Sequence, residues 1–415
     1  MGTEHAWRTP GDGRSDLCAG HAAQPGVRTA AVDPIRDWNL DQPDTWGAVG
    51  HFSIAARTEV ALSGAFPKLS ALIKNNRKII GHDDETILTD DFKGMGDADF
   101  VPLADVPDFY WKHGKQGASR GSEGPNHFAD MDQPGPRGLT LLDMSTQPEG
   151  IDPDRWNQFY DQVTDLLTGD PVSAEHRGLL PFRVWQIFDA MVTFVKDGDR
   201  ERFLRAAGVL AHYIGDACQP LHISYLHDGD PEQPTTRTVH HRDGTTEDVQ
   251  DPLGKGVHGA YEDEMVNAFR EQILGGLKQA PKKAKKTEYV ANGFEAAQRT
   301  IGLMRATFNA IPPVKIVQTF VGLGKGKRGR AEAMWSAFGD NTIEVMRDGC
   351  HLLAILWESA WSLGDGEHTI GATTALAQEK AMEICTDREF LPSLTIDRIG
   401  AKLSRPSAAA KARAA

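Results

Sequence analysis

The segment R-E-R-F-L-R-A-A-G-V-L-A-H-Y-I-G-D-A-C-Q-P-L-H, residues 200–222, decides the expected fold. Its apolar residues recur at intervals of three and four, which predicts an amphipathic helix over most of its length. His212 and Asp216 are four residues apart and therefore leave the same face of that helix. Pro220 ends the helix and can turn His222 back toward the same cavity. Because imidazole and carboxylate groups are ordinary zinc ligands, the segment predicts a helix that carries a metal site.

Similar helical patterns extend in both directions from this segment. The expected helices cover residues 46–75, 156–167, 180–196, 200–218, 257–275, 288–310 and 331–362. Residues 81–150 are rich in Gly, Pro and Asp and indicate long loops, which are uncommon in a compact domain unless they have a function. Residues 228–256 form a polar insertion, and little of the chain shows a strand pattern. We therefore expect an all-α fold, a single multi-helix domain with long loops enclosing a zinc-cluster cleft.

The two ends of the chain differ in composition from its centre. Residues 1–45 are rich in Gly, Ala, Asp, Arg and Pro and are expected to be a flexible leader or pro-segment. Residues 46–365 hold the helical patterns and form the predicted domain. Residues 366–415 are less patterned and end in P-S-A-A-A-K-A-R-A-A, which predicts a partly disordered C-terminal extension.

Composition limits the classes of function. A net charge of −13 and a pI near 5.6 argue against binding nucleic acid through a broad basic face. They do not argue against an enzyme whose bound cations contact an anionic substrate. The chain has no stretch of about 18 apolar residues, so no transmembrane helix is predicted. Residues 1–45 lack the apolar core of a secretory signal, so the compartment stays unknown. Cys218 and Cys350 lie among apolar residues and are expected in the core.

Further candidate ligands lie outside the first segment. His258 and Glu262, in V-H-G-A-Y-E, are again four residues apart, although such pairs are common on solvated helix faces. His51 lies in the first expected helix, where a histidine is by default a buried core residue. Asp105 and His127 lie on the long loops, where a lone Asp is usually a turn residue. Together these residues form a histidine–carboxylate set without cysteine, which suits metals used as Lewis acids.

In their order along the chain, these motifs resemble the zinc-dependent phospholipase C and fungal single-strand nuclease superfamily. Its members are mainly helical phosphodiesterases with three zinc ions, and similar families are usually secreted. The matching pieces are W-G-A-V-G-H at 46–51, A-D at 104–105, H-F-A-D at 127–130, H-Y-I-G-D-A-C-Q-P-L-H at 212–222 and H-G-A-Y-E at 258–262. The segment D-G-C-H-L-L-A-I-L-W at 348–357 resembles the closing helix of the nuclease branch.

The resemblance implies two to three Zn²⁺ ions and a set of ligands for each. The first ion would be held by Asp105, His127, His212 and Asp216. The second would be held by His222, His258 and Glu262. The third would be held by His51, the bridging Asp216, and the amino nitrogen and carbonyl oxygen of Trp46. Asp105 and Asp216 are the implied catalytic carboxylates, Asp105 as the group that orients or deprotonates the attacking water.

One departure concerns the third ion. In the family the equivalent Trp has a free amine, whereas 45 residues precede Trp46 here. A peptide nitrogen has no basic lone pair to donate. The third site therefore requires cleavage after Thr45, or it must use the Trp46 carbonyl alone.

The resemblance implies a zinc-dependent hydrolase of phosphate diesters. We favour a phospholipase C-like enzyme acting on a phospholipid headgroup, because Glu262, in place of an Asp, suits that branch. A single-strand-specific nuclease of the same superfamily is one alternative, and a zinc-stabilised, non-catalytic binding protein is another. No obligate protein partner is indicated. The extra histidines between His222 and His258, namely His227, His240 and His241, are expected to be exposed.

Overall fold

The structure is a computed structural model that describes residues 47–89, 100–112, 122–241, 243–279, 281–324 and 329–404. Contacts divide the chain into Met1–Pro43 and Asp44–Ala415, and every described residue belongs to the second unit. The predicted leader and Trp46 lie outside the described residues. Of the helices that the structure describes, none combines the length and the apolar character needed to cross a membrane.

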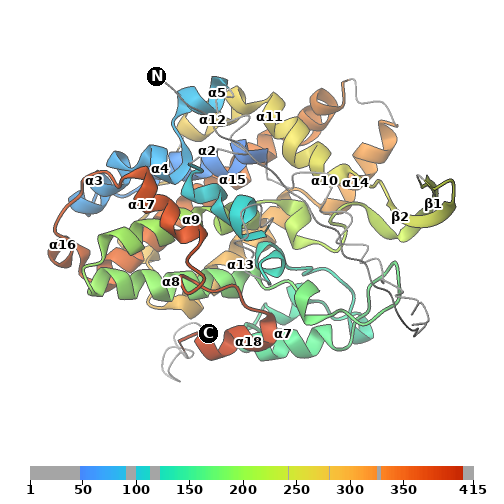
Figure 1. Ribbon diagram of the computed structural model, residues 1–415, viewed down its shortest axis with the longest axis horizontal. Coiled ribbons are helices and arrows are strands. Elements are labelled where there is room, and N and C mark those ends of the chain that lie inside the picture. The colour runs from blue at the N-terminus through green and yellow to red at the C-terminus, as the bar shows by residue number, and fades with distance from the viewer. Residues whose placement is uncertain are drawn as a thin grey trace, which may run out of the picture. The chain divides into compact units, whose positions relative to one another are not determined.

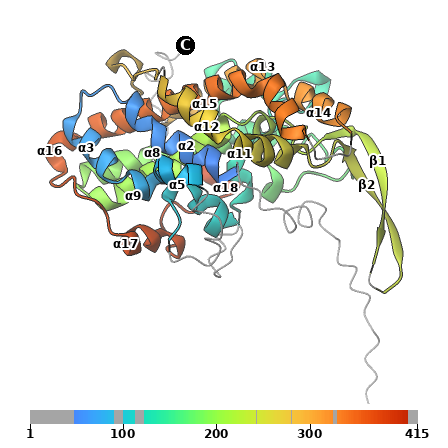
Figure 2. The same ribbon diagram turned by 90° about the horizontal axis from the view of Figure 1, so that it is seen from above.

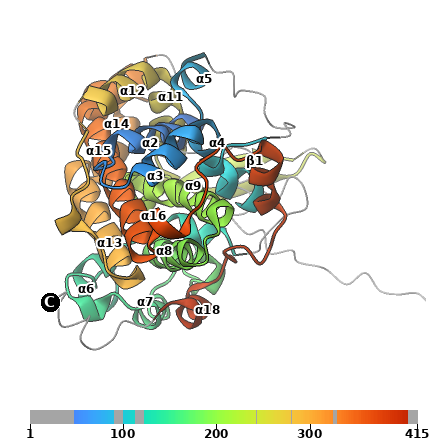
Figure 3. The same cartoon turned by 90° about the vertical axis from the view of Figure 1, so that its left-hand side faces the viewer.

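Four long helices form the centre of the second unit (Figure 1). These are α8 (Leu180–Lys196), α9 (Arg200–Ala217), α13 (Gly293–Ala310) and α15 (Arg330–Leu363). Helix α9 packs against the other three, and α2 (Gly47–Ala61) packs on both α9 and α15. Figure 3 shows α13 and α15 lying beside α8 and α9. Each of the five coincides with all or part of a helix predicted from apolar periodicity.

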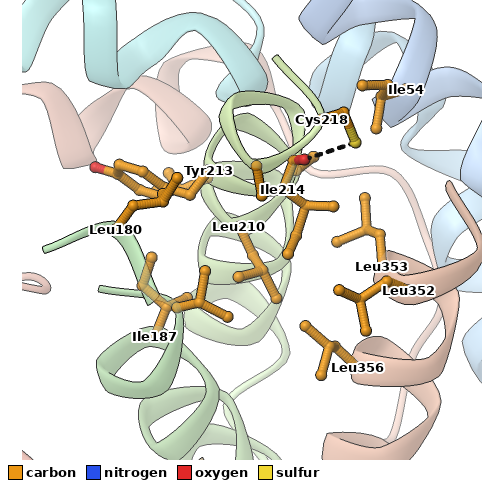
Figure 4. Close-up of a cluster of buried hydrophobic side chains, with 14 of the residues drawn as sticks. Ile54, Leu180, Ile187, Leu210, Tyr213, Ile214, Cys218, Leu352, Leu353 and Leu356 are labelled. Atoms are coloured by element: carbon orange, nitrogen blue, oxygen red, sulfur yellow. Dashed lines mark hydrogen bonds between the residues drawn. The ribbon is translucent and has the colours of Figure 1, made fainter. Parts of the chain in front are cut away.

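Helix α9 is almost entirely buried, and its sequence explains why. The Asp199 side chain caps its N-terminus by accepting a hydrogen bond from the backbone N–H of Arg202 at 3.0 Å. From Phe203 to Ala217 every residue is buried. The side chains that surround α9 in Figure 4 come from α2, α8 and α15: Ile54, Leu180, Ile187, Leu352, Leu353 and Leu356. Burying each such side chain contributes about 1.5–3 kcal/mol, so the helix is fixed by its packing.

The two cysteines predicted in the core are confirmed there. Cys218 and Cys350 are both buried free thiols. The Cys218 thiol donates a hydrogen bond to the carbonyl oxygen of Ile214 at 3.1 Å (Figure 4). The two side chains act as small apolar groups between α2, α9 and α15.

The first predicted helix, residues 46–75, is two helices. Helix α2 ends at Ala61, and α3 (Pro67–Asn75) starts afresh after a turn. Gly64 has φ +83°, a left-handed conformation that interrupts the helix, and Pro67 supplies the first residue of α3. Two short helices follow, α4 (Arg77–Gly81) and α5 (Asp84–Thr89).

Short turns and helices occupy the region predicted as long loops and its continuation to residue 176. They are η2 (Leu103–Asp105), η3 (Pro107–Lys112), η4 (Gly124–His127), η5 (Pro136–Gly138), α6 (Leu141–Met144), η6 (Pro148–Gly150), α7 (Pro153–Tyr160) and η7 (Ala174–His176). After α9, Pro220 opens the single turn η8 (Pro220–Ile223). Turn η2 contacts α2 and α9, and η4 contacts α8 and α9. The loop region is therefore held against the central helices.

The prediction of an all-α fold needs one correction. Residues 230–253 form an antiparallel hairpin of β1 (Asp230–His240) and β2 (Thr246–Leu253). Pairing is regular from Thr235–Asp251 to His240–Thr246 and irregular toward Asp230. The hairpin projects away from the helices (Figure 2), and most of its side chains are exposed. The fold is thus mainly helical with one small sheet.

Helical structure resumes after the hairpin in several short pieces. They are α10 (Val257–Gly259), the π-turn η9 (Ala260–Met265), α11 (Val266–Ala268), α12 (Arg270–Gln279) and η10 (Lys286–Glu288). Helix α14 (Pro313–Gly322) was not predicted. The last described residues form α16 (Gly366–Thr369), α17 (Gln378–Met382), η11 (Glu383–Cys385), α18 (Ile396–Ile399) and η12 (Gly400–Lys402). Helix α18 packs beside α7 (Figure 1), so this segment contributes to the helical core.

Candidate metal centre

Three groups of potential metal ligands meet around the C-terminal half of α9. They are His51–His212–Asp216, Asp108–His127–His212 and His222–His258–Glu262, and the ligand atoms within each group lie within 4.8 Å of one another. All eight residues are buried. The first two groups share His212, and His222 of the third group contacts Asp216 of the first, so the three groups form one continuous cluster.

Asp216 lies at the centre of this arrangement. Its carboxylate is fully buried and lies near four imidazoles: His51 Nε2 at 3.7 Å, His127 Nδ1 at 3.2 Å, His212 Nε2 at 3.4 Å and His222 Nδ1 at 3.0 Å. Helix α9 presents Asp216 and His212 from one face, as their spacing predicts. The turn at Pro220 brings His222 to the same carboxylate, which the sequence also predicted.

A backbone carbonyl orients His212. Its Nδ1 lies 2.7 Å from the carbonyl oxygen of Ala104, in turn η2. A carbonyl can only accept a hydrogen bond, so Nδ1 carries the proton and Nε2 keeps its lone pair. That Nε2 faces Asp216 and His127. The loop at residues 103–105 thus sets the tautomer of a central ligand.

The third group is held by its own network. His258 and Glu262 contact each other directly, and His222 Nε2 lies 3.5 Å from the Glu262 carboxylate. Gln219 Nε2 donates a hydrogen bond to Glu262 at 2.8 Å. Asp228 Oδ1 accepts the backbone N–H of His258 at 3.2 Å, which fixes the start of α10. The i,i+4 pair at 258 and 262 is therefore buried and supported.

Several polar atoms of the cluster suit a cation. Both ring nitrogens of His51 are buried without a hydrogen-bond partner among the described residues, and its Nε2 lies 3.7 Å from Oδ1 of Asp216, the atom that also faces Nδ1 of His222 at 3.0 Å. Leaving such a group unsatisfied costs about 1–3 kcal/mol, and buried polar groups in proteins are rarely left so. Imidazole nitrogens and carboxylate oxygens are the ligands of borderline and hard divalent cations. The donor set fits bound metal ions.

The charges in the cluster are strongly coupled. Burial, together with the nearby His212, lowers the pKa of His51 to about 3, so its ring is neutral. For His222 burial acts in the opposite direction to the Asp216 carboxylate, which prevails and raises the pKa to about 10. The nearby imidazoles hold the pKa of Asp216 well below its usual value against the effect of burial. The Asp216 carboxylate is thus ionised at the point where the ligand groups meet, and the His222 imidazolium faces it.

The structure brings Asp108, rather than Asp105, into a ligand group. Asp108 Oδ1 lies 3.4 Å from His127 Nδ1 and 3.8 Å from His212 Nε2. Asp105 is buried nearby but belongs to none of the three groups, and burial with the neighbouring Asp108 raises its pKa to about 8. Its role as a ligand and base stays a prediction. Asp108 is the second Asp of the segment L-A-D-V-P-D at 103–108, and only the first was predicted as a ligand.

His227 is placed differently from its prediction. It was expected to be exposed, but it is half-buried, with its ring centroid 4.2 Å from that of His258. Its Nδ1 lies 3.2 Å from the carbonyl oxygen of Leu221, so the chain folds back within six residues. His240 and His241, on the hairpin, are exposed as predicted.

No family model matches the chain. The chain is similar to a protein of Bradyrhizobium tropiciagri named a probable serine protease, with 36% identity over 404 residues. The match covers 90% of this chain and 51% of that protein. The chain thus spans about half the length of the curated relative that it matches.

This similarity corrects the predicted function. A relative that is 36% identical over most of the chain is named as a protease, which conflicts with the predicted phosphodiester hydrolase. The phospholipase C-like and nuclease predictions were therefore wrong, and with them the predicted lipid and nucleic-acid substrates lose their support. A hydrolase as the broader class agrees with the relative's name.

Proposed function

We propose that this chain is a metal-dependent hydrolase whose buried histidine–carboxylate cluster holds two or three Zn²⁺ ions. The observation that carries the proposal is the position of Asp216, one buried carboxylate within 3.7 Å of four imidazoles from α2, η4, α9 and η8. A carboxylate has two oxygens, so Asp216 can bridge two adjacent metal ions. The resemblance to the zinc-dependent superfamily stays a prediction and concerns the order of the ligands.

The residues of this chain prepare the site before any substrate arrives. Bound there, zinc ions would supply Lewis-acid polarisation and an activated water. The Ala104 carbonyl holds His212 in one tautomer, and Gln219 holds the Glu262 carboxylate. Asp228 fixes the backbone at His258. These supports keep the ligands in place without reorganisation, which is how outer contacts contribute to a metal site.

The name of the relative directs the substrate proposal to peptide and related acyl bonds. Paired metal ions hydrolyse peptide bonds in aminopeptidases, so the ligand set is compatible with that substrate class. A serine nucleophile would need a histidine base that is itself oriented by a third group. Ser173 Oγ and His176 Nδ1 lie 2.9 Å apart, but on an exposed three-residue turn. The metal cluster is far better shielded from water, so we place the chemistry there.

The experiment compares two inhibitors on the purified full chain. Zinc-loaded protein is assayed on fluorogenic peptide libraries and on simple acyl esters. We expect a metal chelator to abolish turnover, zinc to restore it, and a serine-directed sulfonyl fluoride to leave it unchanged. Loss of turnover with the sulfonyl fluoride alone would overturn the proposal, as would zinc binding without hydrolysis of any acyl substrate.

A further inference from the structure

Outside the metal ligands, a buried carboxylate lies next to His127, on the side of its ring away from Asp216. Glu123 is fully buried at the start of turn η4. One carboxylate oxygen accepts a hydrogen bond from the Tyr213 hydroxyl, and the other accepts one from the Ser393 hydroxyl. The Arg183 guanidinium lies 3.7 Å from the same carboxylate, also fully buried. These contacts join η4, α8, α9 and the C-terminal segment.

The ring of His127 lies between this network and the metal ligands. Its Nδ1 faces the ligand side, at 3.0 Å from His212 Nε2 and 3.2 Å from Asp216. Its Nε2 faces the opposite way, 3.6 Å from Glu123 Oε1, which is an ion-pair distance slightly longer than a hydrogen bond. In metal sites a ligating histidine usually donates its second ring N–H to a carboxylate or carbonyl, which fixes the ring. Glu123 has the position of such a carboxylate.

Arg183 extends the network to residues close to the C-terminus. It donates hydrogen bonds to the carbonyl oxygens of Leu391 and Pro392 at 3.0 and 3.1 Å. Its guanidinium also lies over the rings of Trp111 and Tyr213, at 5.6 and 5.2 Å from their centroids. A buried ion pair is a poor way to gain stability, because desolvation offsets the attraction between the charges. Its position next to a metal ligand indicates another role.

We propose that Glu123 is a positioning residue of the metal centre and that Ser393 connects the C-terminal segment to it. The Glu123 carboxylate attracts the Nε2–H side of His127 across 3.6 Å, so that Nδ1 points toward Asp108, His212 and Asp216. The Ser393 hydroxyl and Arg183 fix the carboxylate in turn. This inference rests on the metal centre of the proposed function, but not on the bond that is hydrolysed.

The test measures cation affinity in the full chain, stripped of metal and titrated with Zn²⁺ against a chromophoric chelator. Removal of such an outer partner typically lowers metal affinity about 10–100-fold, which is the loss we expect for Glu123→Gln. Ser393→Ala should weaken zinc binding in the same direction by a smaller factor. Ser404→Ala is the matched control. That serine lies in the same segment but contacts Trp185 and Asp189, away from His127, and its loss should leave affinity unchanged.

A spectroscopic readout separates positioning from simple stabilisation. Co²⁺-loaded Glu123→Gln should show altered visible absorption bands, because the orientation of a ligand changes. If Glu123→Gln does not fold, Ser393→Ala still tests the inference, because it removes one contact of the same carboxylate. Zinc affinities and Co²⁺ spectra like those of the parent, accompanied only by lower melting temperatures, would overturn the inference and leave the proposed function standing. A parent chain that binds no cation would overturn both.

Discussion

Asp216 is the residue on which the metal centre most depends. Asp216→Asn keeps the shape of the side chain but removes the charge that the four neighbouring imidazoles surround. We expect loss of at least one bound zinc per chain and of most hydrolysis, a larger effect than the ~10–100-fold expected for an outer partner. Elemental analysis and the peptide assay measure this. Asp248→Asn, on the exposed hairpin, is the control, and equal zinc content in both variants would contradict the prediction.

At the scale of single residues, the sequence predicted ligands that lie close together on one element. His212 with Asp216, and His258 with Glu262, could be predicted because helical spacing places them on one face. Asp108 and His227 were missed because their places depend on how loops fold back on helices far away in sequence. Neither periodicity nor local composition contains that information.

At the scale of elements, the long amphipathic helices were predicted and the polar or interrupted ones were not. Helices α8 and α9 begin and end within a residue of their predicted limits, since apolar periodicity is their main determinant. The hairpin was missed because β1 contains Pro231 and Pro234 and alternates little, its side chains being mostly exposed on both faces. Such a hairpin depends on pairing and turn geometry rather than on a buried face.

The start of α10 offers a test at this scale. No local side chain caps this helix, and Asp228, from the other side of the hairpin, accepts the N–H groups of Gly256 and His258 instead. Because a lost cap costs about 1 kcal/mol, Asp228→Ala should destabilise the fold by about that amount. It should also weaken zinc binding at the group containing His258. Chemical denaturation and zinc titration measure the two effects, with Asp248→Ala as the control. An unchanged zinc affinity would show that the cap does not support the site.

At the scale of the whole molecule, the segment after Asp365 completes the core. Ile384, Ile396 and Ile399 are fully buried, and the Trp111 indole donates a hydrogen bond to the carbonyl oxygen of Ile384 at 3.1 Å. Burial of three such side chains corresponds to roughly 5–9 kcal/mol, comparable with the total stability of about 5–15 kcal/mol of a typical domain.

A chain ending after Asp365 should therefore fail to fold stably. We expect it to be insoluble, or to melt far below the parent in circular dichroism. A chain ending after Ser404 keeps every contact described here and is the matched control. Parent-like melting of the shorter chain would show that the segment is dispensable.

The packing of α2 against α15 has a consequence for how the protein is made. The backbone N–H of Ser63 bonds to the Glu358 carboxylate, 295 residues later in the chain. At about 5–20 residues per second, the ribosome needs roughly 15–60 s to synthesise that interval. Throughout this time His51 has been translated but its helix lacks the partner that encloses it. All eight ligand residues, the last of which is Glu262, are therefore synthesised before α15 can complete their enclosure.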